Sequence, residues 1–369
     1  MKYYIIAGEA SGDLHGSNLI KELRKLDTDA GIRCWGGDKM QAAGAELVKH
    51  YRELAFMGFA EVLMNLRTIF RNLAFCKKDI LANQPDVLIL IDYPGFNLRI
   101  AKWAKEQGLK VIYYISPQVW AWKENRVKMM KECIDKMLVI LPFEKDYYKN
   151  KWDWEVEYVG HPLVEVVESE KSNVKSEKFS DKSIVALLPG SRKQEILKKL
   201  PVMLELSRSF PDYQFIVAKA PGADEAFYNE LLKGYANVYY VSGKTYDLLL
   251  QAKAALVTSG TATLETALFE VPEVVCYKGS YLSYQIGKRV IRVKYISLVN
   301  LIMDKLVVKE LIQNDLTAKN LEIELQELLT DKNRQLQLKN DYAALKELLS
   351  KGGNASAKAA ASIYQFLSK

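Results

Sequence analysis

The polar segment Ser259-Gly260-Thr261 follows directly on an apolar run, Ala254–Val257, that predicts a buried strand. We expect Ser259 and Gly260 to form a turn and Thr261 to cap the next helix. The free backbone N–H groups and the positive dipole end of such a helix suit a phosphate or a nucleotide. Glu265, one turn further on, could accept hydrogen bonds from ribose hydroxyls. The alternative is a capped helix with an exposed glutamate.

A second junction of this kind carries an arginine. Gly190-Ser191-Arg192 lies between the predicted strand Ile184–Leu188 and a helix predicted from about Gln194. Backbone N–H groups and one guanidinium fork are what a diphosphate needs. The alternative is a Pro-Gly turn beside a solvated arginine.

Two carboxylates in the first half also follow predicted strands. Glu9 comes after Tyr3–Ala7, in a loop whose glycines at positions 8, 12 and 16 do not match the dinucleotide fingerprint. Asp92 ends the continuous apolar strand Pro85–Asp92, a pattern typical of central parallel strands. Open α/β sheets bind ligands at the carboxyl ends of their strands, so we expect a polar site there.

Apolar residues of the first half could contact a lipid. A set with helical spacing predicts either a core helix or an amphipathic helix on a membrane surface. Trp120 and Trp122 follow the predicted strand Val111–Ile115 and would form an apolar wall or pack within the domain. The set with helical spacing is Phe59, Val62, Leu63, Leu66, Ile69, Phe70 and Leu73.

Composition indicates a globular protein of two domains. The chain has 369 residues, of which 49% are hydrophobic and 26% charged. With 52 basic and 45 acidic residues, the net charge of +7 fits an anionic membrane surface or a phosphorylated substrate, and is too small to indicate nucleic acid. The four cysteines are far apart, so neither a disulfide framework nor a zinc site is predicted. We expect no signal peptide and no membrane-spanning segment.

Strands and helices alternate in both halves, which predicts two Rossmann-like α/β domains facing across a cleft. A polar stretch from Glu165 to Lys182 indicates the boundary. We expect an acceptor-binding, membrane-facing domain over residues 1–165 and a UDP-sugar-binding domain over 166–350. A C-terminal helix over 351–369 could pack back on the first domain.

Five segments, in order along nearly the whole chain, resemble the lipid-A-disaccharide synthase family. They are Gly8–Asp13, Met57–Val62, Ser116–Trp122, Leu188–Arg192 and Ser259–Glu265. The resemblance implies a B-type glycosyltransferase fold and an inverting transfer of 2,3-diacylglucosamine from UDP-2,3-diacylglucosamine to 2,3-diacylglucosamine 1-phosphate (lipid X). It also implies peripheral attachment to the anionic cytoplasmic face of the inner membrane of a Gram-negative bacterium. A homodimer is a further possibility, and no nucleic-acid partner is expected.

The resemblance also implies roles for residues at matching positions. Asp92 would be catalytic and Glu9 a polar group near the acceptor. The donor site would contain Gly190, Ser191, Arg192, Ser259, Gly260, Thr261, Glu265, Asn300, Glu310 and Gln313. The acceptor, the acyl chains or the membrane would meet Ser11, Asp13, Met57, Phe59, Val62, Leu63, Leu66, Phe70, Trp120 and Trp122. Two positions depart from the pattern: Gly95 stands where many members have Asp, and Val299 where many have Pro.

The chemistry of an inverting transfer agrees with these roles. One base takes the acceptor proton and another group stabilises charge on the leaving UDP, as Asp92 and Arg192 could. The scheme needs no metal or other cofactor, and Asp27-Thr28-Asp29 is predicted to be a solvated loop. His15 and His161 are rival bases, with a structural histidine as the alternative for each.

Two other functions are compatible with such a fold. One is a UDP-sugar epimerase, which would need no acyl-binding face. The other is a non-catalytic module for nucleotide sugars or nucleic acid, which would need a concentrated basic patch, whereas the basic residues here are interleaved with acids.

Overall fold

The computed structural model describes residues 1–54, 66–172, 177–220, 223–280, 284 and 293–368. The chain forms two compact units. Unit 1 contains Met1–Pro162 and Leu349–Lys369, and unit 2 contains Leu163–Leu348. The sequence places the corresponding boundaries at residues 165 and 350.

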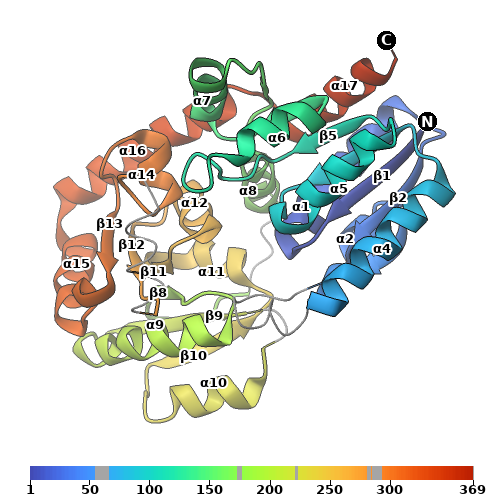
Figure 1. Ribbon diagram of the computed structural model, residues 1–369. Helices are drawn as coiled ribbons and strands as arrows, with labels where there is room; N and C mark the ends of the chain where they lie inside the picture. Colours follow the sequence, from blue (N-terminus) through green and yellow to red (C-terminus); the bar gives the residue numbers. More distant parts are fainter. Residues whose placement is uncertain (55–65, 173–176, 221–222, 281–283, 285–292, 369) are drawn as a thin grey trace. The chain divides into compact units, whose positions relative to one another are not determined.

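Unit 1 is built on a parallel sheet with the strand order β3-β2-β1-β4-β5-β6-β7 (Figure 1). Its strands are β1 (Lys2–Ala7), β2 (Gly31–Gly36), β3 (Glu46–His50), β4 (Val87–Ile91), β5 (Val111–Tyr114), β6 (Lys136–Val139) and β7 (Glu157–Tyr158). Its helices are α1 (Ala10–Leu26), α2 (Asp38–Ala42), α4 (Leu66–Asn83), α5 (Pro94–Glu106), α6 (Arg126–Cys133), α7 (Pro142–Trp152) and α17 (Ala355–Leu367).

Helices cover both faces of this sheet. The chain runs outward from β1 to β2 in one direction and from β4 to β5 in the other, and right-handed crossovers then place the connecting helices on opposite faces. Helix α1 packs against α2 and α17, whereas α5 packs against α4 and α6. Burial on both sides explains why β1 and β4 are almost continuously apolar.

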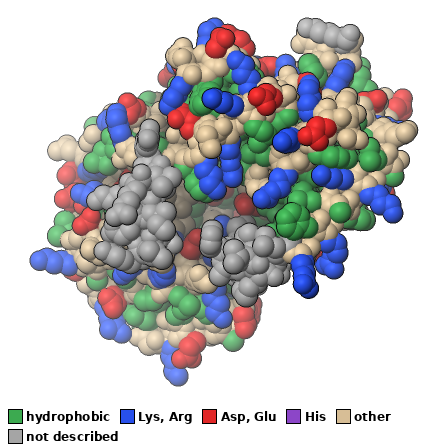
Figure 2. Space-filling model, in the orientation of Figure 1, with side chains coloured by type: hydrophobic (Ala, Val, Ile, Leu, Met, Phe, Trp, Pro, Cys, Tyr) green, Lys and Arg blue, Asp and Glu red, His purple; other side chains and the backbone are tan. Residues whose placement is uncertain are grey.

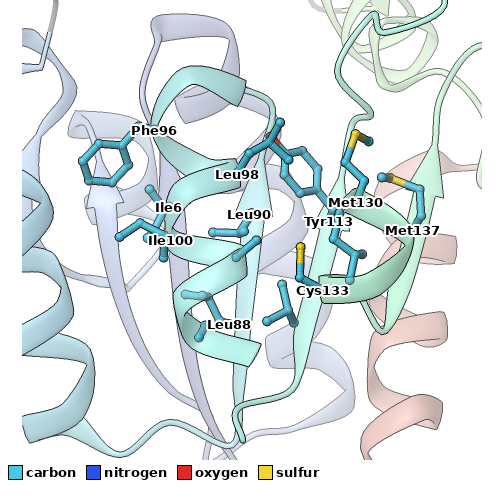
Figure 3. Packing of buried hydrophobic residues seen from close by; sticks show 14 of the residues in the cluster. Ile6, Leu88, Leu90, Phe96, Leu98, Ile100, Tyr113, Met130, Cys133 and Met137 are labelled. Atoms are coloured by element: carbon cyan, nitrogen blue, oxygen red, sulfur yellow. The ribbon is translucent and has the colours of Figure 1, made fainter. Parts of the chain in front are cut away.

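The core beneath α5 and α6 is formed by alternate strand residues. Ile6, Leu88, Leu90 and Tyr113 point toward these helices and are fully buried. Figure 3 shows them in contact with side chains from the helices, and the period of two along each strand decides which residues reach this face. The helix residues labelled there are Phe96, Leu98, Ile100, Met130 and Cys133.

Unit 2 repeats the architecture with the strand order β10-β9-β8-β11-β12-β13, also parallel. Its strands are β8 (Ser183–Leu188), β9 (Tyr213–Lys219), β10 (Val238–Ser242), β11 (Ala252–Thr258), β12 (Glu273–Tyr277) and β13 (Lys309–Ile312). Its helices are α8 (Pro162–Ser172), which begins at the end of unit 1, α9 (Lys193–Leu206), α10 (Glu225–Leu232), α11 (Thr245–Gln251), α12 (Thr261–Leu268), α14 (Leu298–Met303), α15 (Ala318–Thr330) and α16 (Lys332–Ser350).

Charged side chains are mixed over the surface. On the face that Figure 2 draws, the Lys and Arg side chains of each unit are interspersed with acidic and apolar ones.

Candidate functional site

Glu9 and Asp92 meet at the point where the strand order of unit 1 reverses. Strands β1 and β4 are neighbours, with Ala7 paired to Ile91, and the chain leaves them in opposite directions. Glu9 is the N-cap residue of α1, and Asp92 immediately follows β4. Such a switch point is where open α/β sheets bind ligands. The structure therefore brings the two predicted carboxylates together.

The backbone at Asp92 is held in an unusual conformation. Its φ is 45°, in the left-handed region, which typically costs about 1–3 kcal/mol and persists only when the surroundings fix it. The Asp92 carbonyl oxygen accepts hydrogen bonds from Asn97 Nδ2 at 2.8 Å and from the Tyr113 hydroxyl at 2.5 Å. Asn97 is fully buried and also donates to the carbonyl of Ile91, at 3.1 Å. These contacts end β4 one residue earlier than predicted.

The surroundings make Asp92 a stronger base than an ordinary aspartate. Burial, followed by the negative charge of Glu9, raises the pKa of Asp92 to about 7. A carboxylate with a pKa near neutrality is partly ionised at pH 7 and holds an accepted proton well, as a general base must.

The rival histidines are poor bases. His15 and His161 are buried, and burial lowers the pKa of His15 to about 4 and that of His161 to about 3. Both rings are therefore neutral at pH 7 and hold a proton weakly.

Ser11 and Asp13 differ in their surroundings. Ser11 is exposed on the first turn of α1. Asp13 is 3% exposed, and its carboxylate accepts from the backbone N–H groups of Gly37 at 2.8 Å and Met40 at 3.0 Å. These bonds tie α1 to the start of α2, so a contact of Asp13 with the acceptor stays a prediction.

The two tryptophans have different environments. Trp120 donates to Glu144 Oε1 at 3.1 Å and packs edge-on against Phe143, with ring centroids 5.0 Å apart. Trp122 is 48% exposed, and Lys123 Nζ lies 4.1 Å from its ring centroid. Glu144 was not singled out from the sequence, since its contact with Trp120 depends on the packing of α7 against the loop.

Helix α4 exposes Phe70, one of the apolar residues predicted to face a membrane, and also exposes Phe75. Phe70 is 63% exposed and Phe75 47%, whereas Leu73 is buried on the same helix. Met57, Phe59, Val62 and Leu63 lie outside the described residues, as does the side chain of Leu66. None of the helices in the described part of the chain is long and apolar enough to cross a membrane.

Unit 2 has an equivalent switch point between β8 and β11, where Leu188 pairs with Val257. Gly190-Ser191-Arg192 leaves β8, and Arg192 is the exposed N-cap residue of α9, 3.4 Å from Glu195 Oε1. Gly190 has a φ of +113°, and a Cβ there would lie 2.7 Å from Glu195 Oε2. Only glycine fits this turn without strain.

The helix that follows β11 begins one residue earlier than predicted. Gly260, with a φ of 145°, is the N-cap residue of α12, and Thr261 is its first helical residue, so the expected Thr261 cap is wrong. Glycine can adopt this backbone angle at a cap, whereas threonine would be strained. Ser259 Oγ donates to the carbonyl of Ile296 at 2.8 Å and ties the turn to the 296–300 segment.

Glu265 is held by a residue that the sequence did not suggest. The Tyr246 hydroxyl, on α11, donates to Glu265 Oε1 at 3.0 Å. Burial raises the pKa of Glu265, and the bond from Tyr246 opposes that effect. Tyr246 carries no local motif, so only the packed structure identifies it.

Asn300 and Glu310 order the segment after position 295. Glu310 accepts from the N–H groups of Ile296 and Ser297 and from Asn300 Nδ2, at 2.9–3.1 Å. Asn300 is fully buried; its side-chain oxygen accepts from the N–H groups of Val307 and Val308, and Nδ2 also donates to the Val308 carbonyl. Direct contact of these two side chains with a nucleotide remains a prediction.

Gln313 and Lys199 complete this edge of unit 2. Gln313 has a φ of 56°, and its Oε1 accepts from the N–H of Gly279 at 3.2 Å. Lys199 is 3% exposed, contacts Thr258 Oγ1 at the end of β11 and lies 3.8 Å from Glu195. Burial lowers the pKa of Lys199. In the described part of the chain, no three His, Cys, Asp or Glu side chains group as metal ligands.

Comparison with known proteins identifies the family. A family model described as lipid-A-disaccharide synthetase matches residues 3–364. The chain belongs to this family. The lipid-A-disaccharide synthase of Geobacter metallireducens is 41% identical, over 99% of this chain and 97% of its own. Lipid-A-disaccharide synthase 1 of Legionella pneumophila is 38% identical, over 94% and 92% of the two chains.

Solved structures share the fold at low sequence identity. The glycotransferase of kitacinnamycin has a TM-score of 0.69 at 15% identity, covering 99% of both chains. UDP-GlcNAc 2-epimerase from Neisseria meningitidis, bound to UDP-GlcNAc, has a TM-score of 0.65 at 12% identity, covering 95% of this chain and 100% of that one. This likeness shows only the twin-Rossmann, B-type fold. Membership of the lipid-A-disaccharide synthase family makes the protein a glycosyltransferase, and the epimerase alternative is not favoured.

Proposed function

We propose that the protein transfers 2,3-diacylglucosamine from UDP-2,3-diacylglucosamine to 2,3-diacylglucosamine 1-phosphate, with inversion at the anomeric carbon. The products are the β-1,6-linked disaccharide 1-phosphate and UDP. The proposal combines membership of the lipid-A-disaccharide synthase family with one observation, a buried Asp92 whose pKa is about 7 at the switch point of unit 1.

Asp92 is the general base in this proposal. It accepts the proton of the acceptor's 6-hydroxyl while that oxygen bonds to the anomeric carbon of the donor. The bond from this carbon to the UDP oxygen breaks at the same time, which inverts the anomeric centre. Glu9 assists by raising the pKa of Asp92 through its negative charge.

Unit 2 holds UDP in the same proposal. The N–H groups at the start of α12 and the Arg192 guanidinium stabilise the diphosphate, on which charge develops as the bond breaks. Glu265, held by Tyr246, accepts hydrogen bonds from the ribose hydroxyls. Asn300 and Glu310 keep the neighbouring segment in place.

We further propose that unit 1 attaches to the anionic cytoplasmic face of the inner membrane through α4, because both substrates carry acyl chains. The exposed Phe70 and Phe75 rings, with exposed Arg67 and Arg71 beside them, support this assignment. The proposal leaves open whether the protein acts as a monomer or as a homodimer, which a measurement of its mass in solution decides.

Release of UDP by the purified protein tests this function. The assay contains both lipids in detergent, with EDTA, beside the Asp92→Asn variant. We expect wild-type release to need both lipids, and Asp92→Asn to bind UDP normally while losing most of its turnover. Normal turnover by Asp92→Asn would remove Asp92 from the mechanism. No release from a folded wild-type protein that binds UDP would contradict the function itself.

A further inference from the structure

Two cations, Lys123 and Arg126, lie where the loop between β5 and α6, residues 115–125, meets the helix, and neither has a role in the proposed reaction. Lys123 is exposed and Arg126 is partly exposed, at the end of the loop and the start of α6. Among the ion pairs of the described residues, neither takes part in one. Two adjacent positive charges without a counter-ion are unfavourable, and an anion bound between them would remove the repulsion.

The loop is fixed rather than free to relax away from the site. Ser116 Oγ hydrogen-bonds with the Tyr148 hydroxyl at 2.6 Å, and Trp120 donates to Glu144 at 3.1 Å. Both partners lie on α7, so the loop is attached to that helix at two points. Its end is closed by a turn in which Arg126 N–H donates to the Lys123 carbonyl at 3.0 Å.

The nearest acidic residue in sequence is already engaged elsewhere. Glu124 Oε1 lies 2.5 Å from Lys151 Nζ and accepts from the Tyr147 hydroxyl at 2.7 Å. Both contacts again come from α7. Glu124 is therefore a third attachment of the loop to α7, and its charge is balanced by Lys151 and not by Lys123 or Arg126.

The loop that leads to the two cations starts beside the proposed base, because the Asp92 N–H donates to the carbonyl of Tyr114, the last residue of β5, at 3.3 Å. Strands β4 and β5 are paired neighbours, and the Tyr113 hydroxyl on β5 donates to the Asp92 carbonyl. Burial raises the pKa of Tyr113, and the positive charge of Arg126 opposes this effect. Partial loss of hydration, and then the charge of Arg126, lowers the pKa of Lys123. The reacting hydroxyl and the phosphate of the acceptor lie at opposite ends of one hexose, so a phosphate site must lie about one sugar away from Asp92.

We propose that Lys123 and Arg126 bind the phosphate monoester of the acceptor sugar. This inference rests on the proposed function, since it names the group that holds the acceptor end of that reaction. Arg126 supplies a guanidinium fork that matches phosphate oxygens, and Lys123 adds a point charge. The ammonium group of Lys123 lies over the exposed Trp122 ring, and this cation–π contact restricts the conformations of the lysine side chain.

Equilibrium binding of two lipids by the full chain in detergent tests the proposal without turnover. The probes are diacylglucosamine 1-phosphate and the same lipid without its phosphate. We expect wild type to prefer the phosphorylated lipid, and Arg126→Gln and Lys123→Met each to lower that preference about tenfold, because each removes a charge-assisted contact. Affinity for the lipid without phosphate should not change. Arg126→Lys should restore part of the preference.

Lys128→Met is the matched control, since Lys128 is exposed on α6 and its loss changes the net charge equally. An unchanged preference in the Lys123→Met/Arg126→Gln double variant would overturn the proposal, as would an equal loss for both lipids or an equal loss in Lys128→Met. Vesicles of phosphatidylcholine with and without phosphatidylglycerol separate a membrane headgroup from the acceptor. Weaker vesicle binding with an intact preference in detergent would assign the cations to the membrane and overturn the proposal.

The phosphate site and the proposed reaction can fail separately in these experiments. If the variants lose the phosphate preference while the wild type releases no UDP from the two lipids, the phosphate site is supported and the reaction is not. If the wild type releases UDP and the variants keep their preference, the reaction is supported and the phosphate site is wrong.

Discussion

Asp92 gains its basicity from where β4 ends. The strand delivers it to a buried edge next to Glu9, and Asn97 and Tyr113 hold its carbonyl so that the left-handed backbone persists. The side chain itself is an ordinary carboxylate. The raised pKa of Asp92 therefore results from its surroundings in the fold, and substitutions of neighbouring residues can change it.

The pH dependence of turnover tests this origin. Asp92 must be ionised to accept a proton, so activity should fall as the pH drops through about 7, the raised pKa of Asp92. Glu9→Gln removes a nearby negative charge and should move this limb of kcat/KM to lower pH, while burial keeps it above the value of about 3.9 for an exposed aspartate. A limb that stays in place in Glu9→Gln would contradict the coupling.

Tyr246 is expected to act through Glu265. Tyr246→Phe removes the hydrogen bond that orients the carboxylate, so the Kd for UDP should rise several-fold, up to about tenfold. Tyr239→Phe is the control, because that hydroxyl also donates one hydrogen bond in unit 2, to the Phe179 carbonyl at 2.6 Å. Titration with UDP measures the Kd of both variants. An equal loss of UDP affinity in the two would indicate a general effect on stability and would contradict the role of Tyr246.

Single residues of the site differ in how visible they are in the sequence. Asp92 and Arg192 could be found because Asp92 directly follows an apolar strand and Arg192 lies in the short turn after another, and strand ends meet at one edge of a parallel sheet. Tyr246, Glu144 and Lys199 could not, since each sits inside a helix with no motif and meets its partner only after packing. The sequence also could not show that both ends of the Asn300 side-chain amide hydrogen-bond to backbone groups within unit 2.

At the scale of elements, the buried strands were the most predictable. Apolar runs predict nine strands, and all nine are present with ends shifted by at most two residues. Besides the five named from the sequence above, they include Met137–Ile140, Gln214–Ala218, Val238–Val241 and Val274–Tyr277. Strands β2, β3, β7 and β13 were missed. β7 has only two residues, which is too short for a recognisable pattern. β3 and β13 are edge strands that contain charged residues, so their sequences give no clear apolar run.

Helix α4 allows a test of membrane attachment. Phe70→Ser and Phe75→Ser together should weaken binding to anionic vesicles while changing the free energy of unfolding little, because both rings are exposed. Leu73→Ser, on the same helix but buried, should instead destabilise unit 1 by about 2–5 kcal/mol. Co-sedimentation and thermal melting distinguish them. Unfolding of the Phe70→Ser/Phe75→Ser variant would assign these rings to the core.

The whole molecule is two units of which the first is completed by a distant segment. Helix α17 packs against α1, Ser362 Oγ donates to Glu157 at 2.6 Å, and the Tyr158 hydroxyl donates to the Leu349 carbonyl at 3.2 Å. Unit 2 is thus inserted between two parts of unit 1. The stability of unit 1 therefore depends on hydrogen bonds between residues 191 and 205 positions apart, and on the packing of helices from the two ends of the chain.

The two parts of unit 1 come very close together at Gly352, which lies against the backbone of Gly160. A Cβ at Gly352 would lie 2.2 Å from Gly160 Cα, so Gly352→Ala must displace backbone and should destabilise unit 1 by about 1–3 kcal/mol or more. Gly95→Ala is the control in the same unit, since nothing lies within 4 Å of its Cβ position, and it should change stability by at most about 1 kcal/mol. Chemical denaturation measures both, and equal effects would contradict the prediction.

The insertion of unit 2 also has a consequence during protein synthesis. The ribosome delivers the first part of unit 1, then the 186 residues from Leu163 to Leu348, and only afterwards α17. At bacterial elongation rates, this leaves the apolar face of α1 without its partner helix for roughly 10–40 s. Unit 2 is one continuous segment, whereas unit 1 stays incomplete until α17 is made, so a chaperone that shields apolar helices has this interval in which to bind α1.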